Sequence, residues 1–85
     1  MDLEDEAGRV VTRQDLVELV TRMASVSSSP EMLEWENNTL PRFLDGLAAW
    51  IAGMDGYFRN QGLEVPDQPS WRLVGDMLVA ATLYE

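Results

Sequence analysis

The chain has 85 residues, a formal net charge of −9 and neither cysteine nor histidine. The absence of cysteine excludes a disulfide framework and thiolate metal sites, and the absence of histidine removes the commonest general base. Fifteen acidic residues face only six arginines and no lysine, a balance that would repel a nucleic-acid backbone.

These properties favour a single non-catalytic domain that holds no metal or cofactor and binds no nucleic acid. The opening residues, MDLEDEAG, are acidic where a signal peptide would be basic and then apolar. No apolar run approaches the ~20 residues that a membrane span requires. We therefore expect a cytoplasmic chain without a membrane segment, in which residues 1–9 form a flexible acidic tail and residues 10–85 a single helical domain.

The first predicted helix covers about residues 13–25. Thr12 and Asp15 have the spacing of a capping box, and apolar residues then recur at helical spacing, namely Leu16, Leu19, Val20 and Met23. The serines that follow, and Pro30, are expected to end the helix. Residues 30–36 form either a short helical turn, with Ser29 as its cap, or an irregular connection, and the sequence does not decide between the two.

The second predicted helix covers about residues 39–61, with Asn38 or Thr39 as its cap and Gly62 as its terminator. It carries the widest apolar stripe of the chain, which comprises Leu40, Phe43, Leu44, Leu47, Trp50, Ile51, Met54, Tyr57 and Phe58. We expect the other helices to pack along it.

The third predicted helix covers about residues 68–84 and follows a connection that contains two prolines. Asp67 or Ser70 is its cap, and its apolar stripe begins at Trp71 and ends near Tyr84. No segment has the pattern of a strand. The fold class is therefore predicted to be all-α, a small three-helix bundle with a short turn at 30–36 as an open addition.

The stretch AWIAGMDGYFRNQG, residues 49–62, has the composition of a ligand loop, but it lacks the ligand spacing of a calcium loop and the lysine of a phosphate loop. Its glycines instead continue a stripe of small residues formed by Gly46, Gly53 and Gly56. Each glycine costs up to ~1 kcal/mol in a helix. Three explanations for these glycines remain: a neighbouring segment of the same chain approaches closely, another chain docks in a groove there, or the helix simply tolerates them.

Carboxylates are numerous but follow no catalytic or metal-binding spacing. Glu31, Glu34 and Glu36, together with Asn37, could ligate a hard cation, although a solvated acidic segment is the simpler interpretation. Asp55 and Arg59 are spaced as an ion pair on one helix face. The three tryptophans are expected in the core, Trp35 least clearly of them.

Five short motifs stand out along the chain: the WENNTL run that begins at Trp35, the AW pair at Ala49, the DGYF run at Asp55, the PSW run at Pro69 and the final YE pair. Together they resemble the motifs of a family of small bacterial proteins of unknown function. The likeness extends over about residues 13–85. It implies a bacterial, cytoplasmic, stand-alone domain and draws attention to Trp35, Asn37, Asp55, Tyr57 and Trp71, but it brings no assigned function.

Two functional hypotheses remain. The first is a non-catalytic protein-interaction domain that binds a basic partner, and a toxin-neutralising immunity protein is one concrete form of it. The alternative is a homo-oligomeric structural domain; the oligomeric state is left open. The candidate interaction surface comprises Trp35, Asn37, Gly53, Asp55, Gly56, Tyr57 and Asn60.

Overall fold

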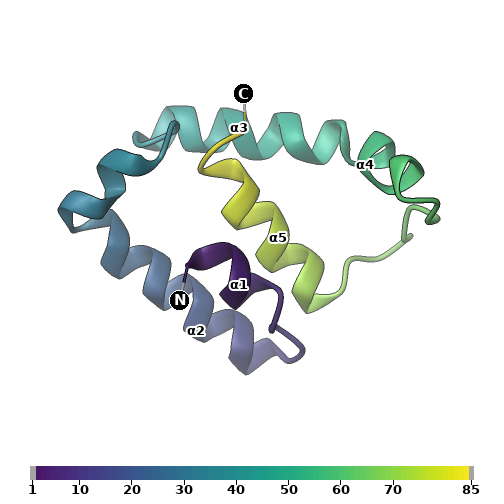
Figure 1. Cartoon of the computed structure of the whole chain (residues 1–85), viewed down its shortest axis with the longest axis horizontal. Coiled ribbons are helices and arrows are strands. Elements are labelled where there is room, and N and C mark those ends of the chain that lie inside the picture. The colour runs from purple at the N-terminus through teal and green to yellow at the C-terminus, as the bar shows by residue number, and fades with distance from the viewer. Residues whose placement is uncertain (1, 85) are drawn as a thin grey trace.

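The computed structural model describes residues 2–84 and places six helices and no strand within them, so the predicted all-α fold class is confirmed. Figure 1 shows the elements in chain order. They are α1 (Leu3–Ala7), α2 (Arg13–Ser27), the 3₁₀ helix η1 (Pro30–Glu34), α3 (Leu40–Ala52), α4 (Met54–Asn60) and α5 (Trp71–Ala81). None of these helices is long and apolar enough to cross a lipid bilayer.

Side-chain hydroxyls begin four of the helices. Thr12 and Asp15 form the complete capping box of α2, and the two backbone N–H groups that donate to its carboxylate lower the pKa of Asp15. Where the sequence left alternatives open, the structure selects a helical turn at 30–34 and the hydroxyl caps Ser29, Thr39 and Ser70. A hydroxyl that accepts from an otherwise unpaired N–H contributes about 1 kcal/mol to each helix start.

The amino-terminal segment differs from the predicted flexible tail. Residues 3–7 form α1, which contacts both α2 and α5. Ala7 and Val10 are 1% and 2% exposed, and the Glu6 carboxylate lies 3.2 Å from the Arg22 guanidinium. Asp2 caps the helix, and burial of Ala7 and Val10 supplies the packing energy that a five-residue helix lacks by itself. Met1 lies outside the described residues.

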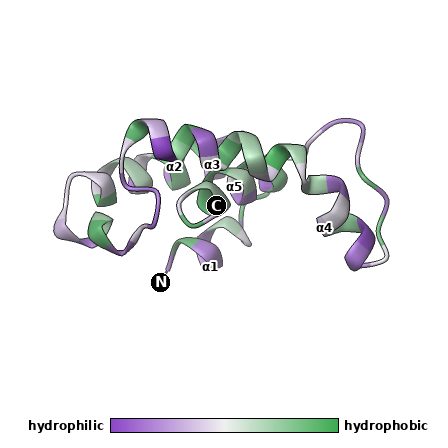
Figure 2. Ribbon diagram, turned by 90° about the horizontal axis from the view of Figure 1, so that it is seen from above, coloured by the Kyte–Doolittle hydropathy of each residue, from purple (hydrophilic) through white to green (hydrophobic). Residues whose placement is uncertain are grey.

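The predicted helix 39–61 is divided at Gly53, where the backbone (φ −95°, ψ 4°) leaves the α-helical region and α4 turns away from α3 (Figures 1 and 2). Glycine favours a break here because it loses more conformational entropy in a helix than any other residue. Gly62 ends α4 as predicted, with φ at 70°. The amide of Gly62 donates to the Arg59 carbonyl and the amide of Leu63 to the Phe58 carbonyl, which is a Schellman motif.

The centre of the molecule is α5 and not the predicted helix 39–61. α5 contacts α1, α2 and α3, whereas no Cα of α2 lies within 8 Å of a Cα of α3. Gly75 on α5 explains part of this arrangement, because a Cβ built there would meet the Leu19 side chain of α2 at 3.0 Å. At Gly46 of α3, a Cβ would meet the carbonyl oxygen of Ala81, at the end of α5, at 2.8 Å. Absence of a Cβ at these two positions lets both neighbours approach, so the shorter helix occupies the centre.

Candidate protein-docking groove

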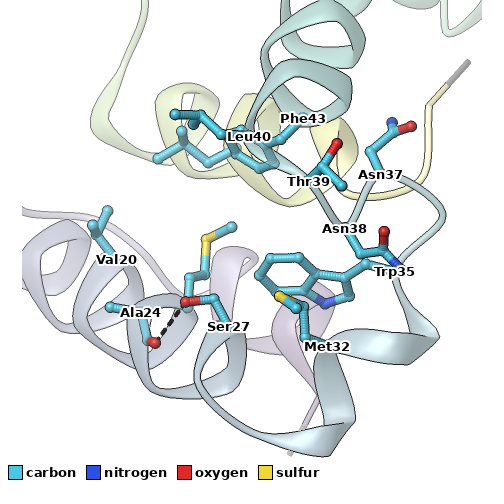
Figure 3. Close-up of a pocket in the computed structure, with 12 residues that line it drawn as sticks. Val20, Ala24, Ser27, Met32, Trp35, Asn37, Asn38, Thr39, Leu40 and Phe43 are labelled. Atoms are coloured by element: carbon cyan, nitrogen blue, oxygen red, sulfur yellow. Dashed lines mark hydrogen bonds between the residues drawn. The ribbon is translucent and has the colours of Figure 1, made fainter.

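An open apolar groove of about 400 Å³ separates α2 from α3 (Figure 3). Val20 and Ala24 of α2 line one wall, Leu40 and Phe43 of α3 line the other, and Leu78 of α5 also contributes. Its remaining lining residues come from α2, η1 and the connection to α3, and they are Met23, Ser27, Met32, Trp35, Asn37, Asn38 and Thr39. None of these described residues carries a charge, so the groove can bury apolar surface without desolvating an ion.

Trp35 forms the end of this groove. It follows η1 in extended conformation (φ −78°, ψ 129°), with its amide bonded to the Met32 carbonyl at 3.0 Å. Its indole ring stacks on Phe43 with 6.5 Å between ring centroids, and in Figure 3 Met32 lies beside it. The indole is half-buried and packs against the core cluster. Trp35 is therefore both an extension of the core, as the sequence predicts, and a wall of the groove.

An acidic pocket of about 460 Å³ lies on another side of Trp35, which lines both cavities. Four carboxylates line this pocket, from Asp2, Glu4, Glu31 and Glu34. The guanidinium of Arg22 also lines it and is paired with Glu6. Within residues 2–84 no group of three acidic side chains is close enough together to hold a metal ion. Trp35 thus lies between an uncharged apolar groove and a slightly larger, negatively charged cavity.

Asn37 has a structural role that the sequence alone did not reveal. Its side chain is buried, and Nδ2 donates to the carbonyls of Ala81 at 2.8 Å and Tyr84 at 2.6 Å. Its backbone amide donates to the Thr82 carbonyl at 2.9 Å. These bonds satisfy carbonyl groups at the end of α5 that have no partner within the helix. Asn37 therefore holds residues 81–84 against the start of α3, and its Nδ2 group donates both of its hydrogens within the chain.

The other predicted surface residues lie at α4, beyond the far end of α3. The thirteen residues of α3 separate the two groups by roughly 20 Å. Gly53, Asp55, Gly56, Tyr57 and Asn60 therefore do not share a site with Trp35 and Asn37. Asp55 and Arg59 form the predicted ion pair at 2.7 Å, but both side chains are exposed, as is usual for a solvated pair worth a few tenths of a kcal/mol.

Tyr57 and its neighbours form a separate cluster around a third cavity of about 330 Å³. The Tyr57 ring lies 5.6 Å from Trp50 and edge-on to Phe58 at 5.3 Å. Asp76 of α5 also lines this cavity, and burial raises the pKa of its carboxyl against the opposing effect of Arg72. Trp71, at the start of α5, is 45% exposed and not in the core as predicted.

The small-residue stripe is covered only in part. A Cβ at Gly46 would meet Asn37 Nδ2 at 2.5 Å and the carbonyl oxygens of Ala81 and Tyr84 at 2.8 and 2.9 Å. At Gly53 the nearest atoms are 3.5 Å away, and at Gly56 there is open space. Close approach within the chain thus explains Gly46, whereas Gly53 acts as a helix break and Gly56 has no packing role in the structure.

Several residues that line the groove, Val20, Leu40 and Phe43 among them, were predicted from their helical spacing to be core residues. Leu40 is nevertheless 70% exposed, and Leu44, Ile51, Val17 and Val20 are also exposed. The sequence contained one signal for this outcome, which is the width of the apolar stripe on helix 39–61. A chain of this size buries only roughly 60% of its unfolded surface, so such a wide stripe exceeds what two neighbouring helices can cover.

No curated protein and no solved structure matches this chain. A model of a family of unknown function, DUF7660, matches residues 12–85, which include α2 through α5 and exclude α1. Every lining residue of the apolar groove falls in the matched range, as do the Asn37 bonds to the end of α5. With this match over most of its length, the chain belongs to the DUF7660 family of unknown function.

Proposed function

We propose that this protein is a non-catalytic interaction domain and that the apolar groove between α2 and α3 is its docking surface. The observation that supports the proposal is an uncharged groove of about 400 Å³ bordered by exposed apolar side chains of two helices whose Cα atoms lie more than 8 Å apart throughout. Exposed apolar surface of this kind is typical of protein interaction sites. The groove contains two hydroxyl side chains, and both make hydrogen bonds at helix ends. Ser27 donates to the Ala24 carbonyl, and Thr39 accepts from the Arg42 amide.

Site-specific photo-crosslinking in living cells of the organism that produces the protein tests this proposal. The photo-crosslinking side chain is placed at Leu40, on the edge of the groove, and in a matched variant at Leu33, which is 74% exposed and lines neither the groove nor the acidic pocket. We expect a discrete crosslinked protein from position 40 and none from position 33. Equal products from both positions would refute the groove as the docking surface.

A toxin-neutralising immunity protein is one specific form of this function, supported by the small size and the net charge of −9. In that case the crosslinked protein is a toxin that the wild-type chain inhibits. Leu40→Ser should weaken the inhibition and Leu33→Ser should not. A partner without toxic activity would exclude the immunity form but retain the interaction domain.

Self-association is the second candidate function, because Leu40, Leu44 and Ile51 form one exposed stripe along α3. Sedimentation velocity at increasing concentration distinguishes it. A homo-oligomer weakened by Leu44→Ser would support the structural role, whereas a monomer at all concentrations would exclude it.

A further inference from the structure

The groove lies between two helices that both pack on a third. α2 and α3 both contact α5, whereas no Cα of α2 lies within 8 Å of a Cα of α3. Packed helices lie about 8–10 Å apart, so a segment between α2 and α3 that also contacts Leu78 could complete a helix bundle. Val20 and Ala24 are four residues apart on α2, and Leu40 and Phe43 three apart on α3. Side chains at these spacings form ridges on α2 and α3, and the side chains of an amphipathic helix can pack into the grooves between such ridges.

The negative charge of the protein favours some partners over others as the source of such a helix. Trp35 lines both the groove and the acidic pocket, where Asp2, Glu4, Glu31 and Glu34 outnumber the one lining arginine, Arg22. A second copy would bring another net charge of −9 to this surface, and like charges disfavour that association. Anionic lipid surfaces and nucleic acids would be repelled for the same reason. Lysine or arginine next to the apolar face of the bound segment would instead be attracted.

We infer that the groove and the acidic pocket together bind a basic amphipathic helix of a partner protein, with its apolar face between α2 and α3 and a basic side chain beyond Trp35. This inference rests on the proposed function and specifies the chemistry of the partner. It also divides the contributions of the two cavities. The groove contributes affinity by burying apolar surface, and the pocket selects the charge of the partner and increases the association rate.

The test uses the full chain and a labelled fourteen-residue probe peptide with leucines at helical spacing and lysines elsewhere, which spans ~21 Å as a helix. Peptide anisotropy and tryptophan fluorescence measure its binding. A peptide of the same composition in scrambled order controls for charge alone, and a peptide with glutamate in place of lysine controls for the apolar face alone. We expect binding of the first peptide only, with the dissociation constant rising as salt is added.

Variants of the chain locate the two contributions. Glu31→Gln with Glu34→Gln should weaken binding about fivefold at low salt. The matched pair Glu64→Gln with Asp67→Asn removes the same charge from exposed residues that line neither cavity and should leave binding nearly unchanged. Leu40→Ser should weaken binding about tenfold, and Leu33→Ser should not weaken it. Both of these leucines are more than two-thirds exposed, so the variants are expected to remain folded, which circular dichroism verifies.

The outcomes separate the inference from the proposed function. Equal binding of the ordered and scrambled peptides, or equal effects of the two charge-removing pairs, would overturn the basic-helix inference. Binding that depends on Leu40 but not on lysine would also overturn it, while the docking groove would stand. Self-association that Leu40→Ser weakens and Leu33→Ser does not would assign the groove to a second copy and would overturn the inference as well.

Discussion

Asn37 joins the start of α3 to the end of α5 by three hydrogen bonds, to the carbonyls of Ala81, Thr82 and Tyr84. Replacement by leucine removes the side-chain donor and leaves buried carbonyl oxygens without a partner. An unpaired buried polar group costs about 1–3 kcal/mol. We therefore predict that Asn37→Leu lowers the free energy of unfolding by about 1–3 kcal/mol in urea denaturation.

Asn38→Leu is the neighbouring control, because the structure shows no side-chain bond from Asn38 to the end of α5. A loss for Asn37→Leu no larger than for Asn38→Leu would contradict the bridging role of Asn37.

Gly46 and Gly56 provide a matched pair of glycines within helices. Alanine at Gly46 would place its Cβ under 3.0 Å from two carbonyl oxygens, whereas alanine at Gly56 would meet no atom within 4 Å. We predict that Gly46→Ala destabilises the fold by about 1–3 kcal/mol through overpacking. Gly56→Ala should stabilise it by about 0.5–1 kcal/mol through helix propensity. Urea denaturation of both variants measures the difference, and effects of the same sign would contradict the packing at Gly46.

Asp76 gives the stability of the protein a dependence on pH. Burial raises the pKa of its carboxyl in the folded chain, so the folded state binds this proton more tightly than the unfolded state. Protonation therefore adds stability as the pH falls through the raised pKa, and ionisation removes it at neutral pH. We predict that Asp76→Asn gives a small rise in melting temperature at pH 7 that disappears near pH 3.

Asp45→Asn on the exposed surface of α3 is the control for this effect. A melting temperature for Asp76→Asn below that of the wild type at pH 7 would show that the ion pair with Arg72 outweighs the cost of burial.

At the scale of the elements, α4 lies between two glycines, Gly53 and Gly62, whose backbone conformations differ. Gly53 has a negative φ that any residue can adopt, and a Cβ there would make only ordinary contacts at 3.5 Å. Gly62 has a φ of 70°, and a Cβ there would meet no atom within 4 Å, so only its backbone conformation opposes a side chain. We predict that Gly53→Ala stabilises the protein by about 0.5–1 kcal/mol. Gly62→Ala should destabilise it by about 1–2 kcal/mol.

Thermal unfolding of both variants measures these changes. A destabilising Gly53→Ala would indicate that the break between α3 and α4 requires glycine itself and not merely a residue with low helix propensity.

At the scale of the whole molecule, the core includes a segment outside the family match. Val10 is 2% exposed and packs with Leu19 and Met23 of α2 and Val79 of α5, whereas its neighbour Val11 is 77% exposed. We predict that Val10→Ala costs about 1–3 kcal/mol and that Val11→Ala changes stability by less than ~0.5 kcal/mol. Denaturation in guanidinium chloride compares the two, and equal effects would show that the amino-terminal segment does not contribute to the core.

Local features of this protein follow from its sequence alone, because caps, terminators and helical periodicity depend on residues within a few positions of one another. The capping box at Thr12 and the terminator Gly62 were predictable on these grounds, and the caps Thr39 and Ser70 were each one of two predicted alternatives. Three other outcomes depend on contacts between distant segments, which the tertiary structure alone reveals. α1 folds because it packs on α2 and α5, α5 takes the centre because glycines at 46 and 75 permit close approach on its two sides, and Asn37 bonds to residues that lie 44 and 47 positions away. The groove has the same origin. Helical spacing shows which side chains share a face, but whether a neighbouring helix covers that face depends on how the whole chain packs.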